Sequence, residues 1–438
     1  MQAISMTVDE QVIPQEKEHL ALAWLVTLTA SFFFFYAFIQ LNLFNAIDVH
    51  LMQSFQLNAA ELGQLSSLYF YANALLLFPA GILLDRYSTR KILLFAVVLT
   101  TVGTFLFGLA DLYLVAAIGR FMVGAGAAFC FLSCIRIATR WFPPNKMAFV
   151  TGIIVTMAMI GGLVAQTPMA LLSEMIGWRQ AVLLDAGLGV VVLIAVALFV
   201  QDYPPNSHAK FEAQQTQLKS LGFWKSIRLV LLNPQNWFGG IYTALLNLPV
   251  FLLGALWGIH YLMQAHHVSL LQASYATTLL FVGVIVGSPF FGWMSDHMGR
   301  RVLPMIIGAI ASLAVMLALM YIPDLSLGAI LFLFFLIGFV TSSQVLSYPA
   351  VAELNPITLT STAMSVISFT IMFSGVVFQP LFGWLMELHW DHSLVDGVPA
   401  YAPSDMLNAM MIMPIAFIIG FFISLMMKET HCQAQESR

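Results

Sequence analysis

The sequence predicts an all-α membrane protein with twelve transmembrane helices in two similar halves of six. Three observations support this: the composition, a series of long apolar runs, and an internal repeat. Of the 438 residues, 60% are hydrophobic and 9% are charged, whereas a soluble domain has about 45–50% apolar and about 25% charged residues. The composition therefore favours a chain surrounded largely by lipid.

Twelve apolar runs are long enough to cross a hydrocarbon core about 30 Å thick, which takes roughly 20 helical residues. The first run is too long for the apolar region of a signal peptide and follows an acidic segment, so we expect it to remain as a helix. The runs are Leu20–Asn45, Leu62–Leu84, Ile92–Ala110, Leu112–Ile135, Ala148–Leu172, Ala181–Val200, Trp237–Met263, Ala273–Met294, Val302–Ile322, Leu327–Ala350, Ala363–Met386 and Met406–Met427.

The basic residues gather on one side of the predicted membrane. Loops on the other side keep only Arg179, and Arg120 lies inside the fourth run. Because cytoplasmic loops carry an excess of Lys and Arg, we expect both termini on the cytoplasmic side of a bacterial inner membrane. The cytoplasmic set is Lys17, Arg86, Arg90, Lys91, Arg136, Arg140, Lys146, Lys210, Lys219, Lys225, Arg228, Arg300, Arg301, Lys428 and Arg438.

An internal repeat divides the chain. The segment "FPAGILLDRYSTRKILLF" has a partner at "SPFFGWMSDHMGRRVLP", so that Gly81 and Asp85 recur as Gly292 and Asp296, 211 residues later. Nearly the same offset relates "FPPNKMAFVTG" to "LNPITLTSTAM", and Gln166 to Gln379. We therefore expect two six-helix domains, at residues 1–200 and 237–438, joined by the polar cytoplasmic linker 201–236.

These motifs resemble those of the major facilitator superfamily of secondary transporters. The likeness covers essentially the whole chain and includes a second motif, "GRFMVGAGAAF", with Arg120, Gly124 and Gly126. Ser88 and Thr89 stand where the family usually has Gly and Arg. The glycine-flanked Gly-Pro of drug:proton antiporters is missing from "GGLVAQTPMALL". Segments around helices 4 to 6 look like branches that take up amino acids and related metabolites.

The resemblance implies two halves that rock about a central site, which gives the charged loops a gating role. Our hypothesis is that Asp85 docks on the N-terminus of helix 11, braced by Arg140 or Arg90, and that Asp296, Arg300 and Arg301 mirror this against helix 5. A helix N-terminus attracts a carboxylate. The alternative is that these charges, with Arg86 and Lys91, only satisfy the positive-inside bias and tight turns.

The substrate site is expected on helices 1, 4, 7 and 10, which line the cavity in this superfamily. A charge at bilayer depth marks a functional residue by default. Arg120 lies near the midplane and either binds an anionic group of the substrate or pairs permanently with Asp185. A proton on Asp185 would release Arg120 in a coupling step. Arg136 either snorkels to the interface or lines the inner vestibule.

Other polar side chains converge on the same region. Each is either a substrate contact or a hydrogen bond between helices. The predicted substrate-binding set, besides the two arginines, is Tyr36, Gln40, Gln166, Asn247, Trp257, Tyr261, Gln344, Tyr348 and Gln379.

No residue pattern indicates enzymatic or metal chemistry. Cys130, Cys134 and Cys432 form no disulfide framework, and we interpret Cys130 and Cys134 as packing residues of one helix. The chain lacks a Walker loop and the HExxH and GxSxG motifs. We therefore expect no cofactor, no metal, no nucleic-acid partner and no enzyme activity.

The predicted function is alternating-access transport of a small polar solute carrying a carboxylate, such as an amino acid or similar metabolite, imported together with protons. Proton symport is an expectation from the family. A polycarboxylate siderophore transporter, a metabolite or drug exporter and a non-transporting sensor remain alternatives. The fold usually works as a monomer, which we expect here.

Overall fold

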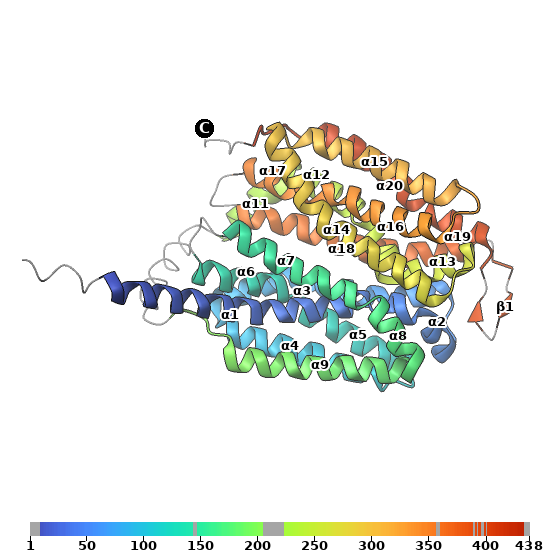
Figure 1. The fold of residues 1–438 in the computed structure, drawn as a ribbon, viewed down its shortest axis with the longest axis horizontal. Coiled ribbons are helices and arrows are strands. Elements are labelled where there is room, and N and C mark those ends of the chain that lie inside the picture. The colour runs from blue at the N-terminus through green and yellow to red at the C-terminus, as the bar shows by residue number, and fades with distance from the viewer. Residues whose placement is uncertain are drawn as a thin grey trace, which may run out of the picture.

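The computed structural model describes residues 9–142, 147–204, 223–355, 360–388, 390–391, 393–395, 398–399 and 401–432. The described chain is almost entirely helical, and the helices lie side by side in one elongated bundle (Figure 1). The centre of the predicted linker lies outside the described residues.

The first half is built from helices that follow the predicted runs but are often broken. The first run becomes two helices, because α1 ends at Asn42 and α2 begins at Phe44. The fourth and fifth runs are also broken in two. The elements are α1 (Asp9–Asn42), α2 (Phe44–Phe55), α3 (Ala59–Arg86), α4 (Thr89–Gly108), α5 (Tyr113–Ala127), α6 (Cys130–Trp141), α7 (Met147–Val164), α8 (Thr167–Ile176) and α9 (Trp178–Phe199).

The second half repeats this arrangement after the short helix α11 (Phe223–Leu232). Its first span contains a π-helical segment, η2, and its fourth contains a 3-10 turn, η3. The elements are α12 (Pro234–Leu246), η2 (Val250–Trp257), α13 (Gly258–His266), α14 (Leu270–Met298), α15 (Val302–Tyr321), α16 (Leu327–Thr341), η3 (Ser342–Leu346), α17 (Ser347–Glu353), α18 (Thr360–Glu387), α19 (Pro403–Met410) and α20 (Ile412–Met426).

Helix starts follow local capping chemistry. Asn58 accepts a hydrogen bond from the amide of Glu61, and the Glu61 carboxylate accepts one from the amide of Asn58 (2.8 and 3.0 Å). Ser269 and Gln272 form the same reciprocal pair before α14. These capping boxes satisfy backbone donors that a helix N-terminus leaves unpaired, and they fix where α3 and α14 begin.

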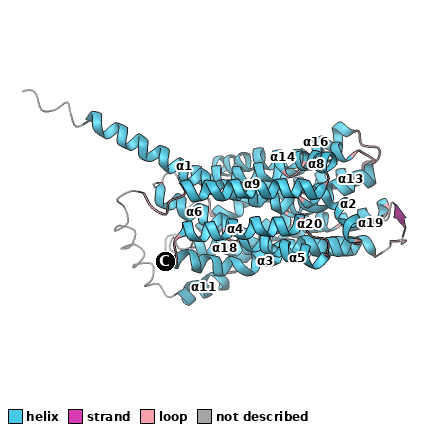
Figure 2. Cartoon of the chain, turned by 90° about the horizontal axis from the view of Figure 1, so that it is seen from below, coloured by secondary structure: helices cyan, strands magenta, loops and turns pink. Residues whose placement is uncertain are grey.

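The two ends of the bundle differ in chemistry. We call the end where Lys91, Arg140 and Arg301 lie the basic end. We call the opposite end the hairpin end, because it carries the short antiparallel strands β1 (Leu394–Val395) and β2 (Val398–Pro399). The described chain begins and ends at the basic end (Figure 1), and the helices connect the two ends in parallel array (Figure 2).

The architecture is that of an integral membrane protein. Within the described residues, ten helical spans, some made of two consecutive helices, are long and apolar enough to cross a membrane, and the bent pair Pro234–Leu246 and Val250–His266 makes an eleventh. Helix α3, with 28 residues, covers the remaining predicted run. Many large apolar side chains lie on the outside of the bundle; Phe95, Trp293 and Phe422 are each more than half exposed. In a membrane these side chains face lipid.

Candidate functional site

The two halves meet closely at the hairpin end. The amide of Ala59, at the start of α3, donates to the Tyr401 hydroxyl (2.8 Å), and the amide of Ala60 donates to the Glu387 carboxylate (3.1 Å). Gly383 packs so closely on Ala59 that an added Cβ would lie 2.4 Å from the Ala59 carbonyl oxygen. The hairpin end is therefore closed between the halves in this conformation.

Arg120 of α5 lies against the break between α1 and α2. Its guanidinium donates to the carbonyl oxygens of Gln40 and Leu41, near the end of α1, where a helix leaves carbonyls without partners. The Phe44 and Tyr69 rings lie 4.2 and 5.0 Å from the guanidinium carbon. The side chain is 2% exposed.

Asp185 of α9 belongs to a neighbouring polar network. The Gln40 side-chain amide donates to the Asp185 carboxylate, and the Thr104 hydroxyl lies 3.1 Å from the Gln40 side-chain oxygen. The Tyr36 hydroxyl donates to that of Thr104 (3.2 Å). Gln40 therefore lies between Arg120 and Asp185. Its backbone carbonyl accepts from Arg120, and its side-chain amide donates to Asp185.

The direct ion pair between Arg120 and Asp185, one of the two sequence-based hypotheses, is not formed in this conformation. Among the described residues, no carboxylate pairs with Arg120. Its charge is offset by two carbonyls and two aromatic faces, which are weaker partners than a carboxylate. Its Nε atom has no hydrogen-bond partner. A buried cation without a counter-ion favours an anionic ligand.

Gln166 and Gln379, predicted as equivalent members of the substrate site, both bind the π-helix η2. The Gln166 side chain donates to the Gly254 carbonyl (2.8 Å), and the Gln379 side chain donates to the Phe251 carbonyl (2.9 Å). Asn45 of α2 donates to Gln166 (2.7 Å) and accepts from the Ile259 amide (3.0 Å). In this conformation both glutamines make interhelical hydrogen bonds around the break in the seventh span.

Asp48, which the sequence analysis did not consider, and His260, a polar side chain of the seventh run, lie in the same interface. The Asp48 carboxylate of α2 and the His260 imidazole of α13 face each other across the halves, with 3.3 Å between Oδ2 and Nδ1. Sequence reasoning placed Asp48 beyond the first apolar run. The sequence did contain a signal for Asp48, because a carboxylate lies directly after an apolar run of membrane length.

The remaining predicted residues are distributed along the seventh and tenth spans. Trp257 is fully buried and stacks on Phe382 with 5.7 Å between ring centroids, while its indole N–H has no hydrogen-bond partner. Tyr261 lies 3.3 Å from His266 and donates to the Leu319 carbonyl (3.4 Å), so it faces α15. Asn247 caps α12.

Gln344 and Tyr348 lie on the tenth span, and both are half-buried. The Gln344 carbonyl accepts from the Thr243 hydroxyl (3.3 Å), and Tyr348 packs against Val351 and its neighbours. Arg136 of α6 is also half-buried. The structure thus brings Arg120, Gln40, Tyr36 and Asp185 together, and gathers Gln166, Gln379 and Trp257 around η2, but leaves Tyr261 apart.

The charged cluster of the first half contacts Asp202, just beyond α9. Asp202 accepts from the Ser88 hydroxyl and from the Arg90 amide (2.9 Å). Arg140 lies 3.5 Å from the same carboxylate, donates to Thr89 (3.1 Å) and packs on the Tyr203 ring. The side chains of Asp85 and Arg86, central to the gating hypothesis, lie outside the described part of the structure, as do residues 356–359 immediately before α18.

The corresponding cluster of the second half is held within that half. Arg301 binds Asp296 (2.6 Å) and Glu353 (2.8 Å), while Arg300 is exposed. Burial lowers the pKa of Arg301, but Glu353 and Asp296 raise it further, so the net pKa lies above its ordinary value. Glu429, beyond α20, accepts from the amides of Arg301 and Val302 (2.7 and 3.0 Å).

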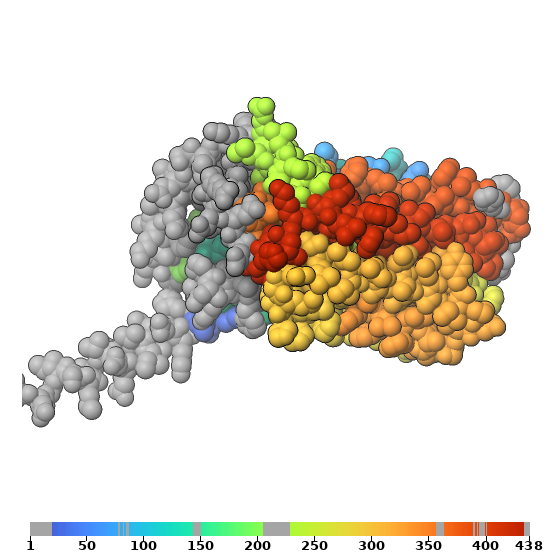
Figure 3. Space-filling model, turned by 90° about the horizontal axis from the view of Figure 1, so that it is seen from above, coloured from blue at the N-terminus to red at the C-terminus, as the bar shows by residue number. Residues whose placement is uncertain are grey.

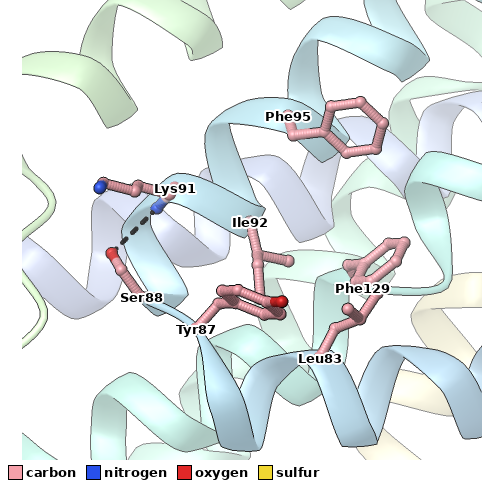
Figure 4. Close-up of a pocket in the computed structure, with 7 residues that line it drawn as sticks. All are labelled: Leu83, Tyr87, Ser88, Lys91, Ile92, Phe95 and Phe129. Atoms are coloured by element: carbon pink, nitrogen blue, oxygen red, sulfur yellow. Dashed lines mark hydrogen bonds between the residues drawn. The ribbon is translucent and has the colours of Figure 1, made fainter.

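A shallow hollow lies beside the first cluster, where the end of α3 meets the start of α4 (Figure 4). Exposed Tyr87 and Phe95 and half-buried Ile92 line it, and the Lys91 amide donates to the Ser88 hydroxyl. The hollow is mainly apolar and lies on the outside of the bundle. It is therefore not the predicted central site.

The arrangement of two six-helix halves around buried polar residues agrees with a family-model comparison. The model described as Major Facilitator Superfamily matches residues 28–259 and, a second time, residues 240–432. The chain belongs to this superfamily. It therefore has the fold of this superfamily of secondary transporters and is not an enzyme.

Curated relatives are about a quarter identical to the chain over the aligned parts. A probable sulfoacetate transporter of Cupriavidus necator is 25% identical over 62% of this chain and 65% of its own length, slightly under two thirds. A D-galactonate transporter of Escherichia coli is 24% identical over 78% of this chain and 84% of its own length. A membrane sensor protein of Salmonella typhimurium is 25% identical over 58% and 60%.

A solved structure shows the same fold. A bacterial homologue of the human lysosomal transporter Spinster, described as inward-facing and unoccupied, superposes with a TM-score of 0.75. The match covers 93% of this chain and 98% of the other, at 19% sequence identity. This likeness concerns the fold alone.

Proposed function

We propose that the chain transports a small organic anion of the sugar-acid or sulfoacid type, with Arg120 as the group that binds the anionic end. The observation that carries this is the environment of Arg120, which is buried beside a helix break and pairs with no described carboxylate. An arginine binds a carboxylate or sulfonate through two parallel hydrogen bonds.

The present partners of Arg120 are replaceable. Its guanidinium contacts two carbonyls at the junction of α1 and α2, and charge-assisted hydrogen bonds to an anion are roughly twice as strong as neutral ones. A substrate that reaches the junction would displace the carbonyls and leave the Phe44 and Tyr69 faces in place. Gln40 and Tyr36, already in the same network, would then meet hydroxyl groups of the substrate.

The relatives support this class of substrate. Sulfoacetate and D-galactonate are both small organic acids, and none of the three relatives described above is named as an amino-acid transporter. The proposal therefore narrows the sequence-based expectation of a carboxylate-bearing solute to organic anions other than amino acids.

The proposed mechanism is alternating access with the basic end in the cytoplasm. Lys and Arg gather at that end, as the positive-inside rule requires. The hairpin end is closed between the halves in this conformation, so substrate exchange would occur from the basic end. We propose that Asp185 acts through Gln40, because its carboxylate accepts from the side chain of the residue whose carbonyl binds Arg120.

The test measures binding of D-galactonate and sulfoacetate to the purified protein, with galactose as an uncharged analogue. Hydrogen bonds to charged groups contribute about 1.5–3 kcal/mol, which is about 10- to 150-fold in Kd. Arg120→Gln should weaken binding of the acids by about that factor. Arg179→Gln is the matched control, since Arg179 is a hairpin-end arginine with a carbonyl and an aromatic neighbour, and it should bind as the unmodified protein does.

Two outcomes would contradict this proposal. Failure of both acids to bind would reject the substrate class. Binding that survives Arg120→Gln unchanged would reject Arg120 as the anchor. Uptake of the same acids into proteoliposomes then tests transport.

A sensor is the second candidate function, because one relative is a membrane sensor protein. Both functions predict binding that depends on Arg120. Only a transporter moves the bound acid across the bilayer, so saturable binding without uptake in proteoliposomes would favour the sensor.

A further inference from the structure

We propose that Asp48, His260 and Trp257 bind the hydroxylated end of the substrate, so that the chain prefers a sugar acid with one carboxylate to the corresponding diacid. The inference rests on the proposed function, in which Arg120 binds the anionic end, and it narrows the substrate class. The argument for Arg120 does not depend on it.

The observation behind the proposal is a group of buried polar atoms around η2 that have no hydrogen-bond partner among the described residues. They are Oδ2 of Asp48, Nε1 of Trp257, both imidazole nitrogens of His260 and Oε1 of Gln379. Trp257 and Gln379 are fully buried, and Asp48 and His260 are 1% and 2% exposed. Unpaired polar groups are rare in the interior of a native protein, so a cluster of them indicates a place for a polar ligand or water.

These side chains come from both halves and lie close together. Oδ2 of Asp48 is 3.3 Å from Nδ1 of His260, but the two atoms form no well-oriented hydrogen bond. The Trp257 ring meets His260 edge-on, with 6.1 Å between ring centroids, and stacks on Phe382. Gln379 lies one helical turn before Phe382 on α18 and donates to a carbonyl of η2. The site therefore joins α2 of the first half to η2, α13 and α18 of the second.

The unpaired atoms differ in what they can bind. The Trp257 indole N–H can only donate, the oxygens of Asp48 and Gln379 accept, and a neutral imidazole has one donor and one acceptor. A hydroxyl group both donates and accepts, so hydroxyl groups can satisfy every member. An ammonium group only donates and would leave the indole N–H without an acceptor. A carboxylate only accepts, and two carboxylates that share a site repel each other.

The cluster lies at a suitable distance from Arg120. Phe44, whose ring is 4.2 Å from the guanidinium carbon of Arg120, stands four residues before Asp48 on α2. The two side chains therefore lie on one face of α2, about 6 Å apart along its axis. An extended six-carbon acid has a comparable length, because its carbon–carbon bonds are about 1.5 Å each.

A sugar acid could thus bridge the two sites. From Phe44, α2 runs towards the hairpin end (Figure 1), so Asp48 lies deeper than Arg120 for a substrate that enters from the basic end. With its carboxylate on Arg120, such an acid would place the hydroxyls nearest the carboxylate at Gln40 and Tyr36. Its last hydroxyls would reach Asp48.

The experiment compares the binding of three acids to the purified protein at neutral pH by isothermal titration calorimetry. Galactarate has a second carboxylate where D-galactonate has its terminal hydroxymethyl group. Sulfoacetate has no hydroxyl group and is too short to reach Asp48 from Arg120, so it reports on the Arg120 site alone. The unmodified protein should bind D-galactonate at least about tenfold more tightly than galactarate, because placing like charges together is costly.

Two variants test the individual side chains. Asp48→Asn removes the charge and keeps an acceptor, so the preference for D-galactonate should shrink by about tenfold, mainly because galactarate binds more tightly. A damaged fold would not produce such a gain. Trp257→Phe removes the indole N–H and keeps a ring beside Phe382, so it should weaken D-galactonate binding by about 3- to 10-fold. Both variants should bind sulfoacetate as the unmodified protein does.

Glu174→Gln is the matched control for Asp48→Asn. Glu174 is an exposed acid on α8, outside the proposed site, and its replacement removes the same charge. The affinities for all three acids should be unchanged in this variant.

Three results would overturn the proposal. The first is an unmodified protein that binds galactarate as tightly as D-galactonate, and the second is an Asp48→Asn variant with an unchanged preference. The third is a loss of sulfoacetate binding in Asp48→Asn or Trp257→Phe, which would make these side chains supports of the Arg120 site. If sulfoacetate binding by the unmodified protein still depends on Arg120, the first two results reject only the hydroxyl site. Failure of all three acids to bind the unmodified protein would reject the proposed function itself.

Discussion

The two charged clusters at the basic end both cap a helix N-terminus, but they do so with different residues. In the first half Asp202, beyond α9, accepts from the Arg90 amide in the first turn of α4. In the second half Glu429, beyond α20, accepts from the amides of Arg301 and Val302 at the start of α15. In each half an acid from beyond the last span thus binds the N-terminus of the third span, α4 or α15, where a negative charge is stabilised.

The difference lies in the residue before each third helix. Ser88 caps α4 with its own hydroxyl, which accepts from the Lys91 amide (3.2 Å). Arg301 occupies the same place before α15 and makes no such cap, so Glu429 binds two amides instead of one. The charge at the end of the fourth helix is also inverted: Arg140 in the first half, Glu353 in the second. The repeat preserves the capping function rather than the residue types.

The largest expected effect follows from removing the centre of the second cluster. Arg301→Gln leaves Glu353, whose side chain is 13% exposed, without a cation, and breaking such a buried pair costs about 3 kcal/mol of unfolding free energy. Arg300→Gln, at the exposed neighbour, should have almost no effect. Denaturant unfolding in mixed micelles measures both. Equal losses for the two variants would mean that the cluster does not stabilise the second half.

Removing the acid that caps α15 should have a smaller, pH-dependent effect. Burial raises the pKa of the Glu429 carboxyl, but the amides of Arg301, Val302, His431 and Thr430 lower it further, so the net pKa lies below its ordinary value. The stabilisation is therefore complete above about pH 4.3, the unfolded value, and is lost as the pH falls through the lower folded value.

At neutral pH, Glu429→Gln should cost about 1–2 kcal/mol, as expected for a charged capping group. The stabilities of the variant and the unmodified protein should converge in acid. Unfolding curves at pH 7 and pH 3.5 test this, and a difference that stays constant between the two would contradict the capping role.

In the first half the cluster depends less on its arginine, Arg140, for its stability. Arg140→Gln should cost about 1–1.5 kcal/mol, since its contact with Asp202 is long at 3.5 Å and Asp202 keeps its bonds from Ser88 and Arg90. The comparison of Arg140→Gln with Arg301→Gln by the same unfolding measurement sharpens the contrast between the halves. A larger loss for Arg140→Gln would reverse it.

The smallest effect is expected for the cap of α4. Ser88→Ala removes a side-chain cap, typically about 1 kcal/mol, while Asp202 continues to accept from the Arg90 amide. The double variant Ser88→Ala with Asp202→Asn should lose more than the two single losses combined, because each acceptor compensates for the other. Strict additivity in a double-mutant cycle would show that the two act independently.

The helical architecture was predictable because lipid imposes a simple pattern. Helix α15 begins at Val302 and ends at Tyr321, within one residue of the predicted run, since an apolar run of membrane length leaves few alternatives to a helix. The repeated Gly81 and Gly292 segments likewise indicated two halves. The break at Leu43 was not predicted, because no Pro or Gly stands beside it. The break before Val250 contains Pro249, a signal that the sequence analysis did not use.

Long-range pairings explain why the site was only partly predicted. Arg120 stood out because a charge within an apolar run is rare, and the structure places it in a buried site. Its contact with Gln40 and the separation of Asp185 depend on how α1, α5 and α9 pack, which the spacing along the chain does not reveal. Asp202 and Glu429 were missed for the same reason: their partners lie 112 and 128 residues away along the chain.

Figure 3 shows the outer surface of the second half. Beneath that surface, the buried π-helix η2 of the seventh span determines which way the last turns of that span point. A π-helix makes one more residue fit into each turn than an α-helix does. Deleting one residue between Val250 and Trp257 would restore α-helical winding and rotate α13 by about 100° relative to α12. His260 would then turn away from Asp48. The orientation of α13 about its axis thus depends on one extra residue in η2. That residue therefore also decides which side chains of α13 face the other half.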